Sequence, residues 1–284
     1  MAAHNDTGID AHILAAVGPD EIPLASRPVD TVPGHWLLAR LGKRVLRPGG
    51  LRLTKLLLRR AEIAGKHVVE FAPGMGRSAL LVLDHHPADY VGVDADPLAA
   101  AWIDKLVSAQ GRAVAAEAAA SGLPDSSADV VLAEGVLTIQ SEQGKADIIA
   151  EGHRLLKPGG RYLLHELSVK DDAAADDDRA TIRAALAHAM HVSARPKTIA
   201  DWREMLEAQG FVVDEVLTSP LALLEPRRVI ADEGIVRALK FARNVLRDRQ
   251  TRERVMAMAK TLRQHKKILQ AVGLVATKPA DGRV

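Results

Sequence analysis

A short run, residues 67–77, combines side chains that could contact a ligand with a backbone that could approach one closely. It reads His-Val-Val-Glu-Phe-Ala-Pro-Gly-Met-Gly-Arg, with Glu70 directly after the apolar residues. Small residues follow at alternate positions, namely Ala72, Gly74 and Gly76. They leave room for a ligand atom beside the backbone, and the apolar stretch after them predicts a helix whose first N–H groups can bind polar atoms. The pattern therefore predicts a strand, a turn and a helix, the first unit of a parallel sheet with a ligand at its edge.

The register of this turn separates two kinds of nucleotide-binding sheet. A dinucleotide loop reads Gly-x-Gly-x-x-Gly, with its acid about 20 residues later. Here the acid ends the first strand, and the pattern Glu70-x-Ala72-x-Gly74-x-Gly76 resembles the first motif of the class I S-adenosylmethionine-dependent methyltransferases, Asp/Glu-x-Gly-x-Gly-x-Gly. Ala72 replaces the first glycine, a change that we expect to be tolerated if its φ is negative, and Pro73 removes one N–H from the loop. An ordinary packing turn is the alternative interpretation.

The second predicted strand, 90–93, is also followed by an acid. Asp94 comes 24 residues after Glu70. The resemblance places Asp94 on the two ribose hydroxyls of the cofactor, with Ala95 beside it, and a carboxylate can accept both hydrogen bonds of a cis-diol. Either Asp94 or Asp96 could instead cap the next helix, because Asp before Pro is a standard helix start. We assign Asp94 to the ligand and Asp96 to the cap.

Later strands supply the remaining cofactor candidates. By the resemblance, Glu117 and Ala118, after the third strand, face the adenine. Glu134 and Gly135 follow the fourth strand, and the carboxyl end of such a strand lies in the ligand crevice. After the first strand, we expect strands at 90–93, 113–116, 129–133, 161–164, 211–217 and 269–277.

Methyl transfer by in-line displacement needs alignment above all, and a hydroxyl or amine acceptor can also need a general base. Candidate bases are His165 and Glu166, at the end of the fifth strand, together with Glu134. Strand alternation lets only one of His165 and Glu166 face the pocket, and both alternatives stay open. Three further histidines lie in segments that could cover the crevice or could be purely structural: His35, His188 and His191.

Two helices are expected ahead of the sheet, at 35–45 and 51–64, the second ending at Gly65 because helix C-termini favour glycine. Between them stands Pro-Gly-Gly at 48–50. This segment resembles one in several small-molecule methyltransferases that approaches the methionine end of the cofactor, which would add Gly50 to the site. A plain helix-connecting turn is equally open.

The later part of the chain carries a strongly basic insertion. We expect helices at 145–156, 181–192 and 198–209, a solvated acidic linker at 171–178, and a helical insertion at about 220–268. From Lys240 to Lys267, ten basic residues stand against two acidic ones. This can be a solvated helical face, or it can attract an anionic acceptor, a membrane surface or RNA. The scarcity of aromatic residues argues against single-stranded RNA, and the apolar face would suit a lid or a homodimer contact.

The amino-acid composition of the chain excludes several classes of site and partner. The chain has 284 residues, a formal net charge of +2 and no cysteine. We therefore expect no disulfide, no thiolate–zinc site, no metal cofactor and no nucleic-acid partner. No apolar run approaches the roughly 18 residues of a membrane helix. No signal peptide is evident at the N-terminus, so we expect a cytoplasmic protein.

Together, the motifs predict an α/β fold: a Rossmann-like, doubly wound sheet of seven mostly parallel strands. We expect an N-terminal helical extension, 1–66, and an S-adenosylmethionine-binding domain, 67–284. The resemblance, to the group that includes quinone-biosynthesis methyltransferases, implies methyl transfer from S-adenosyl-L-methionine to an O, N or C atom of a small-molecule acceptor. A nicotinamide oxidoreductase would need a third glycine and a Tyr–Lys pair, which the pattern lacks. A non-catalytic sensor or scaffold that binds a partner through the basic insertion is the remaining alternative.

Overall fold

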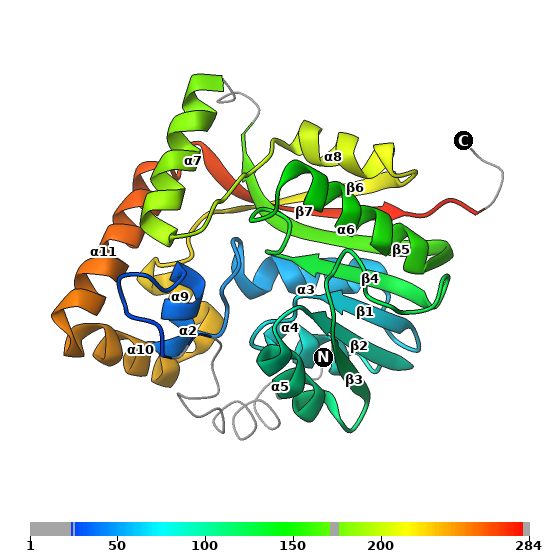
Figure 1. Ribbon diagram of the computed structural model, residues 1–284, viewed down its shortest axis with the longest axis horizontal. Coiled ribbons are helices and arrows are strands. Elements are labelled where there is room, and N and C mark those ends of the chain that lie inside the picture. Colours follow the sequence, from blue (N-terminus) through cyan, green and yellow to red (C-terminus); the bar gives the residue numbers. More distant parts are fainter. Residues whose placement is uncertain (1–23, 25, 171–175, 281–284) are drawn as a thin grey trace, which may run out of the picture.

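The computed structural model describes residue 24 and residues 26–170 and 176–280. Its sheet has seven strands in the order β3-β2-β1-β4-β5-β7-β6 (Figure 1). The strands are β1 (His67–Phe71), β2 (Asp89–Asp94), β3 (Gly111–Ala115), β4 (Ala128–Glu134), β5 (Leu156–Val169), β6 (Val212–Pro220) and β7 (Leu269–Thr277). Pairs from β3 to β5 are parallel, and β7 runs antiparallel to both β5 and β6. The doubly wound, mostly parallel sheet predicted from sequence is confirmed.

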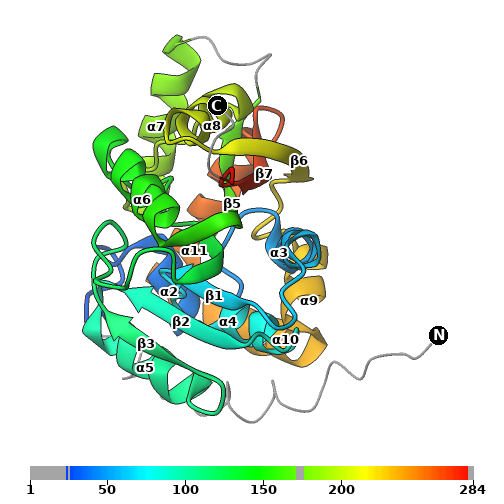
Figure 2. The ribbon, with the colours of Figure 1, turned by 90° about the vertical axis from the view of Figure 1, so that its right-hand side faces the viewer.

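Helices cover both faces of this sheet, because alternate residues of its strands are apolar on each side. The described helices are α2 (Gly34–Arg40), α3 (Gly50–Ala61), α4 (Arg77–Leu83), α5 (Pro97–Val107), α6 (Glu142–Leu155), α7 (Asp176–Met190), α8 (Ile199–Ala208), α9 (Pro226–Glu233), α10 (Ile235–Arg247) and α11 (Arg249–Gln264). Helices α3, α4 and α5 share a buried apolar cluster with one face, and α6 and α8 share another with the opposite face (Figure 2).

A helical cap stands beyond the carboxyl ends of the strands, and its apolar core also includes Leu167 and Val169 of β5 and Leu269 of β7. Residues from α2, α7, α9, α10 and α11 pack together in it, and Met258 is fully buried there. These helices gather on the left of Figure 1. The insertion expected between the last two strands is helical, since α9, α10 and α11 lie between β6 and β7. None of the described helices is long and apolar enough to cross a membrane.

The helices before the sheet end earlier than the sequence predicts. Helix α2 stops at Arg40, because Gly42 has a left-handed φ of 102° and the N–H of Lys43 turns back to the carbonyl oxygen of Leu38 at 3.0 Å. The N–H groups of Arg44 and Val45 then donate to the Glu233 carboxylate, at 2.8 Å each. Helix α3 stops at Ala61, where Glu62 turns into the left-handed region with φ 54°. The expectation that it extends to Gly65 is therefore wrong.

Two further boundaries differ. Strand β5 continues to Val169, paired with β7, so that His165 and Glu166 lie within the strand rather than at its end. The predicted acidic linker is too long, since helix α7 already begins at Asp176. Residues 171–175, like most of the N-terminal segment before residue 26, lie outside the described residues.

Candidate active site

The loop after β1 has the left-handed backbone that its small residues permit. Gly74 and Gly76 have φ of 55° and 76°, and Ala72 has φ of 51°. The condition under which we expect alanine to be tolerated, a negative φ, is thus not met, and Ala72 carries its methyl group in the conformation that favours glycine. A side chain at Gly76 would meet Leu106 at 2.3 Å, whereas at Gly74 the nearest atom is 3.9 Å away. Gly76 is required for packing, and Gly74 leaves open space beside the loop.

Glu70 lies beneath this loop and is buried. It accepts hydrogen bonds from the hydroxyls of Ser78, in the first turn of α4, and of Tyr90, at 2.6 Å on β2. Burial raises the pKa of Glu70 to about 7, although both hydrogen bonds oppose the shift. Glu70 therefore ties β1, β2 and α4 together under the turn rather than lining the cavity above it.

Two aspartates lie at the end of β2 and just beyond it, and both line the cavity. Asp96 accepts from the backbone N–H groups of Leu98 and Ala99, at 2.9 and 3.4 Å, and caps α5. Asp94 lines the cavity. It accepts from the N–H of Asp96 at 3.0 Å and, more weakly, from that of Gly74 at 3.4 Å, and burial raises its pKa. The Asp94 carboxylate is thus fixed against the loop and still faces the ligand space.

A buried polar group lies at the end of β4 and within the neighbouring strand β5. His165 places Nδ1 2.8 Å from Glu134 and Nε2 2.6 Å from the carbonyl oxygen of Pro48. The ring of His165 thus lies between two acceptor oxygens, one from the side chain of Glu134 and one from the backbone of Pro48. Arg47 Nε is 2.9 Å from the other oxygen of Glu134 and donates to Thr54 at 2.9 Å. Burial would raise the pKa of Glu134, but the Arg47 charge and the His165 hydrogen bond lower it to about 2.

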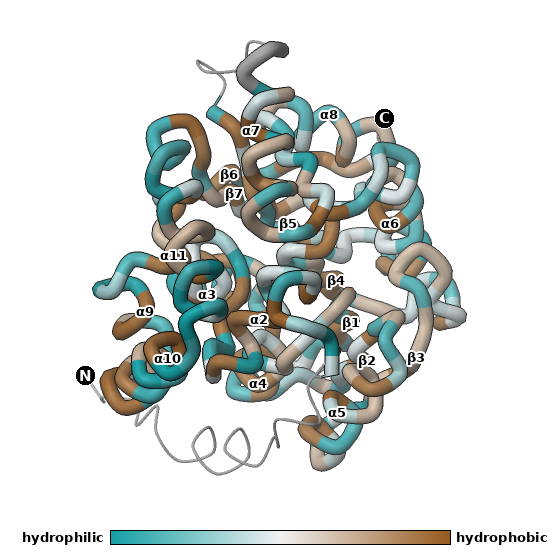
Figure 3. Tube along the Cα trace, turned by 60° about the vertical axis from the view of Figure 1, so that its left-hand side comes forward, coloured by the Kyte–Doolittle hydropathy of each residue, from teal (hydrophilic) through white to brown (hydrophobic). Residues whose placement is uncertain are grey.

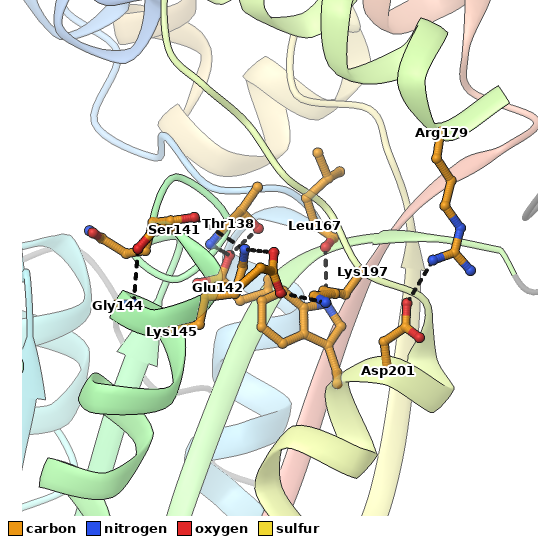
Figure 4. A network of polar contacts seen from close by, with 12 residues as sticks. Thr138, Ser141, Glu142, Gly144, Lys145, Leu167, Arg179, Lys197 and Asp201 are labelled. Carbon is orange, nitrogen blue, oxygen red and sulfur yellow. Dashed lines mark hydrogen bonds and ion pairs between the residues drawn. The ribbon is translucent and has the colours of Figure 1, made fainter. Parts of the chain in front are cut away.

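Glu166 faces the opposite side of β5 and holds the loop after β4. It accepts from the N–H of Leu137 at 2.6 Å and from the N–H and hydroxyl of Thr138 at 3.2 and 2.6 Å. Burial raises its pKa. The far side of the same loop is held by Lys145, whose Nζ donates to the carbonyl oxygen of Gln140 at 3.1 Å. Glu142 lies between Lys145 and Lys197, at 2.9 and 2.6 Å, beside Thr138 in Figure 4. All three candidate bases, Glu134, His165 and Glu166, are therefore engaged in structural hydrogen bonds.

A cavity of about 410 Å³ opens above these groups, between the sheet edge and the cap. Of the predicted site residues, it is lined by Ala72, Pro73, Gly74, Asp94, Ala95, Glu134, Gly135 and Glu166, and by one of the covering histidines, His35. Among the predicted residues away from this lining are Glu70, Gly76, His165 and Gly50. Glu117 is exposed and Ala118 buried in a short turn after β3, also away from it. His188 and His191 are exposed on or just after α7.

Gly50 is not at the cavity because another residue occupies the space beside it. Its φ is 62°, and a side chain there would meet the Asp232 carboxylate of α9 at 2.4 Å. Asp232 accepts from the N–H of Leu51 at 3.1 Å, at the start of α3. The Gly-Gly turn thus makes room for an acid of the cap, which the sequence alone did not indicate.

Sequence reasoning also missed Arg47, the most informative cation of the cavity. Its Nη2 is buried without a hydrogen-bond partner, and so is Oε2 of Glu134, its ion-pair partner. The signal was present, since Arg47 directly precedes the Pro-Gly-Gly turn that the resemblance places near the methionine end of the cofactor. An unpaired buried donor beside a glycine loop and a strand-end aspartate fits a ligand with a carboxylate and a ribose, such as S-adenosylmethionine.

Comparison with known proteins agrees with this geometry. Residues 69–164 match the methyltransferase domain family. An uncharacterised protein of Haemophilus influenzae is 32% identical over 251 residues, covering 86% of this chain and 98% of its own. The cyclopropane synthase MmaA2 of Mycobacterium tuberculosis superposes with a TM-score of 0.64 at 17% identity, over 80% of this chain and 84% of that one. The geranyl diphosphate C-methyltransferase of Streptomyces coelicolor gives 0.59 at 12% identity, over 80% and 77%.

The fold and the domain match define a methyltransferase. The chain belongs to the class I S-adenosylmethionine-dependent methyltransferases, in one family with the Haemophilus protein.

Proposed function

We propose that this enzyme methylates an apolar small-molecule acceptor that enters from the cap side of the cavity. The support is the lining of that side, where aliphatic and aromatic side chains replace the polar groups of the sheet edge. They are Trp36, Leu186, Met190, Val192, Leu221, Leu223 and Leu262. The geranyl diphosphate C-methyltransferase among the structural neighbours is named for an acceptor with an apolar chain.

The cofactor is proposed to lie along the sheet edge. Asp94 would accept hydrogen bonds from the ribose hydroxyls, the open backbone at Gly74 would lie against the ligand, and the free N–H of Arg47 would pair with the methionine carboxylate. Contact of Glu117 and Ala118 with the adenine stays a prediction, since neither lines the cavity. When bound, S-adenosylmethionine supplies a methyl group already activated by its sulfonium.

The protein itself contributes the alignment of the acceptor with the methyl group. For an acceptor that loses a proton, it can also contribute a base. Alignment can supply roughly 7–11 kcal/mol of the barrier. His35 lies in the cavity lining, and burial lowers its pKa to about 4. Its imidazole is therefore neutral at pH 7 and can accept a hydrogen bond from the acceptor, but it is a weak base. Glu134, His165 and Glu166 hold the loops that shape the cavity and act as positioning residues.

The cofactor part of the proposal is tested by calorimetric titration with S-adenosylmethionine and S-adenosylhomocysteine, with NAD(H) as a negative control. Asp94→Ala removes hydrogen bonds to a charged acceptor, so we expect cofactor binding to weaken by about 1.5–3 kcal/mol. Asp104→Ala is the matched control, because Asp104 is an exposed acid of α5 that accepts a hydrogen bond from the N–H of Ala113 and does not line the cavity. Unchanged affinity in Asp94→Ala would remove that residue from the site.

The acceptor part is tested by turnover. The protein is incubated with S-adenosylmethionine and a library that contains apolar and strongly polar acceptors, and S-adenosylhomocysteine is measured. We expect product with apolar acceptors. Turnover confined to strongly polar acceptors would contradict the proposed acceptor class. Cofactor binding without product from any acceptor would favour a sensor or scaffold.

A further inference from the structure

The outer surface of α10 exposes large apolar side chains. Ile235, Leu239 and Leu246 are 67%, 65% and 64% exposed. Their spacing of four and seven residues places them in one stripe along the helix. They do not belong to the apolar core of the cap, because Phe241 and Val245 of the same helix are buried there. Figure 3 shows hydrophobic turns of α10 at the outer edge of the molecule.

A second stripe, next to the first, is cationic. Lys240, Arg243 and Arg247 repeat with spacings of three and four residues, and all three are exposed. Helix α10 contains no Asp or Glu from Ile235 to Arg247. The exposed surface of this helix therefore offers apolar and positively charged groups side by side.

Acidic residues of the neighbouring elements do not neutralise this surface. On α9, Asp232 and Glu233 are directed to the N-terminal segment, where they accept backbone hydrogen bonds. Asp248 caps α11 by accepting from the N–H of Thr251 at 2.7 Å, and Glu253 pairs with Arg249 at 2.7 Å. The local excess of positive charge predicted from the sequence is thus not offset by free acids on these three helices.

Three occupants could cover such a face, and their chemistry separates them. A second copy of the chain would bring another cationic stripe against the first, which is repulsive. Single-stranded RNA needs aromatic platforms, and the aromatic residue of α10, Phe241, is buried. An anionic bilayer offers acyl chains for the apolar stripe and headgroups for the cations, the two contacts of an interfacial amphipathic helix. We propose that the exposed face of α10 binds the surface of an anionic lipid membrane.

The test is sedimentation of the full-length protein with vesicles. Phosphatidylcholine vesicles are compared with vesicles of equal parts phosphatidylcholine and phosphatidylglycerol. We expect binding to the anionic vesicles that weakens as salt is raised. The triple variant Lys240→Gln, Arg243→Gln, Arg247→Gln should lower the partition coefficient on the order of 100-fold, and Leu239→Gln with Leu246→Gln about tenfold or more.

Matched controls carry the same changes elsewhere. Arg52→Gln, Lys105→Gln and Arg112→Gln remove three exposed cations from other elements, and Leu98→Gln removes an apolar side chain that is 61% exposed on α5. These variants should bind vesicles like the unchanged protein, and all variants should keep its melting temperature. The expected results do not depend on which acceptor the enzyme methylates.

Three outcomes would overturn the proposal. The first is no binding to anionic vesicles, and the second is binding that the α10 variants and the controls weaken equally. The third is light scattering that shows a dimer dissociated by the Leu239→Gln and Leu246→Gln changes, which would assign this face to a second copy.

Discussion

Two buried glutamates beside the cavity, both on strands of the sheet, have opposite pKa shifts. Burial by itself raises the pKa of each. At Glu134 the Arg47 charge and the His165 hydrogen bond outweigh burial, and the pKa falls to about 2. At Glu70 two neutral hydroxyls do not outweigh it, and the pKa rises to about 7. Glu134 is therefore charged at every physiological pH, whereas Glu70 changes charge close to neutrality.

The shift at Glu70 predicts how stability depends on pH. Because its pKa is raised from 4.5 to about 7 in the folded state, the folded protein binds a proton that the unfolded chain releases, and stability falls as pH rises from 4.5 to about 7. Glu70→Gln removes this titration and can still hydrogen-bond both hydroxyls. We expect the variant to be more stable than the unchanged protein at pH 8, by on the order of 3 kcal/mol, with little difference at pH 4.5.

Urea unfolding at the two pH values measures this difference. Glu204→Gln, at an exposed position of α8, is the control and should follow the unchanged protein at both. A Glu70→Gln variant that is equally destabilised at pH 4.5 and pH 8 would mean that the carboxyl is needed for packing and that its titration is unimportant.

The role of a single residue could be predicted from the sequence where that role depends only on the residue's neighbours in the chain. Asp96 before Pro97 indicated a cap, and the cap is present. Which of two adjacent residues faces a cavity depends on neighbouring strands, and for that reason the roles of His165 and Glu166 could not be separated. The left-handed φ of Ala72 was equally hidden, since alanine does not require it.

Among the elements, α9 has a positioning role that links the cap to the cavity. Glu233 accepts from the N–H groups of Arg44 and Val45, and its carboxylate is 3.6 Å from Nζ of Lys43, whose side chain is fully buried. The segment held in this way leads directly to Arg47. We therefore expect α9 to influence cofactor binding without touching the cofactor.

Glu233→Gln tests that expectation, since it keeps a carbonyl oxygen for the two N–H groups but leaves Lys43 without its nearest countercharge. Breaking a buried pair in this way costs about 3–5 kcal/mol. We expect a lower unfolding free energy, and a larger Kd for S-adenosylhomocysteine by calorimetry. The double variant Lys43→Met, Glu233→Gln should recover most of the lost unfolding free energy and most of the lost affinity for S-adenosylhomocysteine. A loss of stability with an unchanged Kd would confine Glu233 to a structural role.

This link could not be read from the chain, because Val45 and Glu233 are 188 residues apart. The strands were predictable, since apolar runs and following acids are local patterns and parallel connections obey simple rules. The early end of α2 also has a local cause, the left-handed Gly42, whereas the hydrogen bonds that hold the segment after it come from a distant helix.

For the whole molecule, the cavity lies between the sheet layers and the helical cap, whose apolar core also includes residues of β5 and β7. A ligand at 100 times its Kd adds about 2.7 kcal/mol to the unfolding free energy. We expect S-adenosylhomocysteine to slow hydrogen exchange in the loops at 72–76 and 134–139. The cap residues at 186–194 should respond less, because we propose that they contact the acceptor. Equal protection of both regions would place the cofactor across the cavity.

The position of β7 has a consequence for how the protein is made. β7 lies between β5 and β6 in the sheet, but it leaves the ribosome after β6 and after the three helices from Pro226 to Gln264. At about 5–20 residues per second, β5 and β6 wait several seconds for the strand that joins them. Open strand edges can pair with other chains during that time. The period of greatest risk of aggregation therefore comes during translation, and it ends when the last strand enters the middle of the antiparallel half.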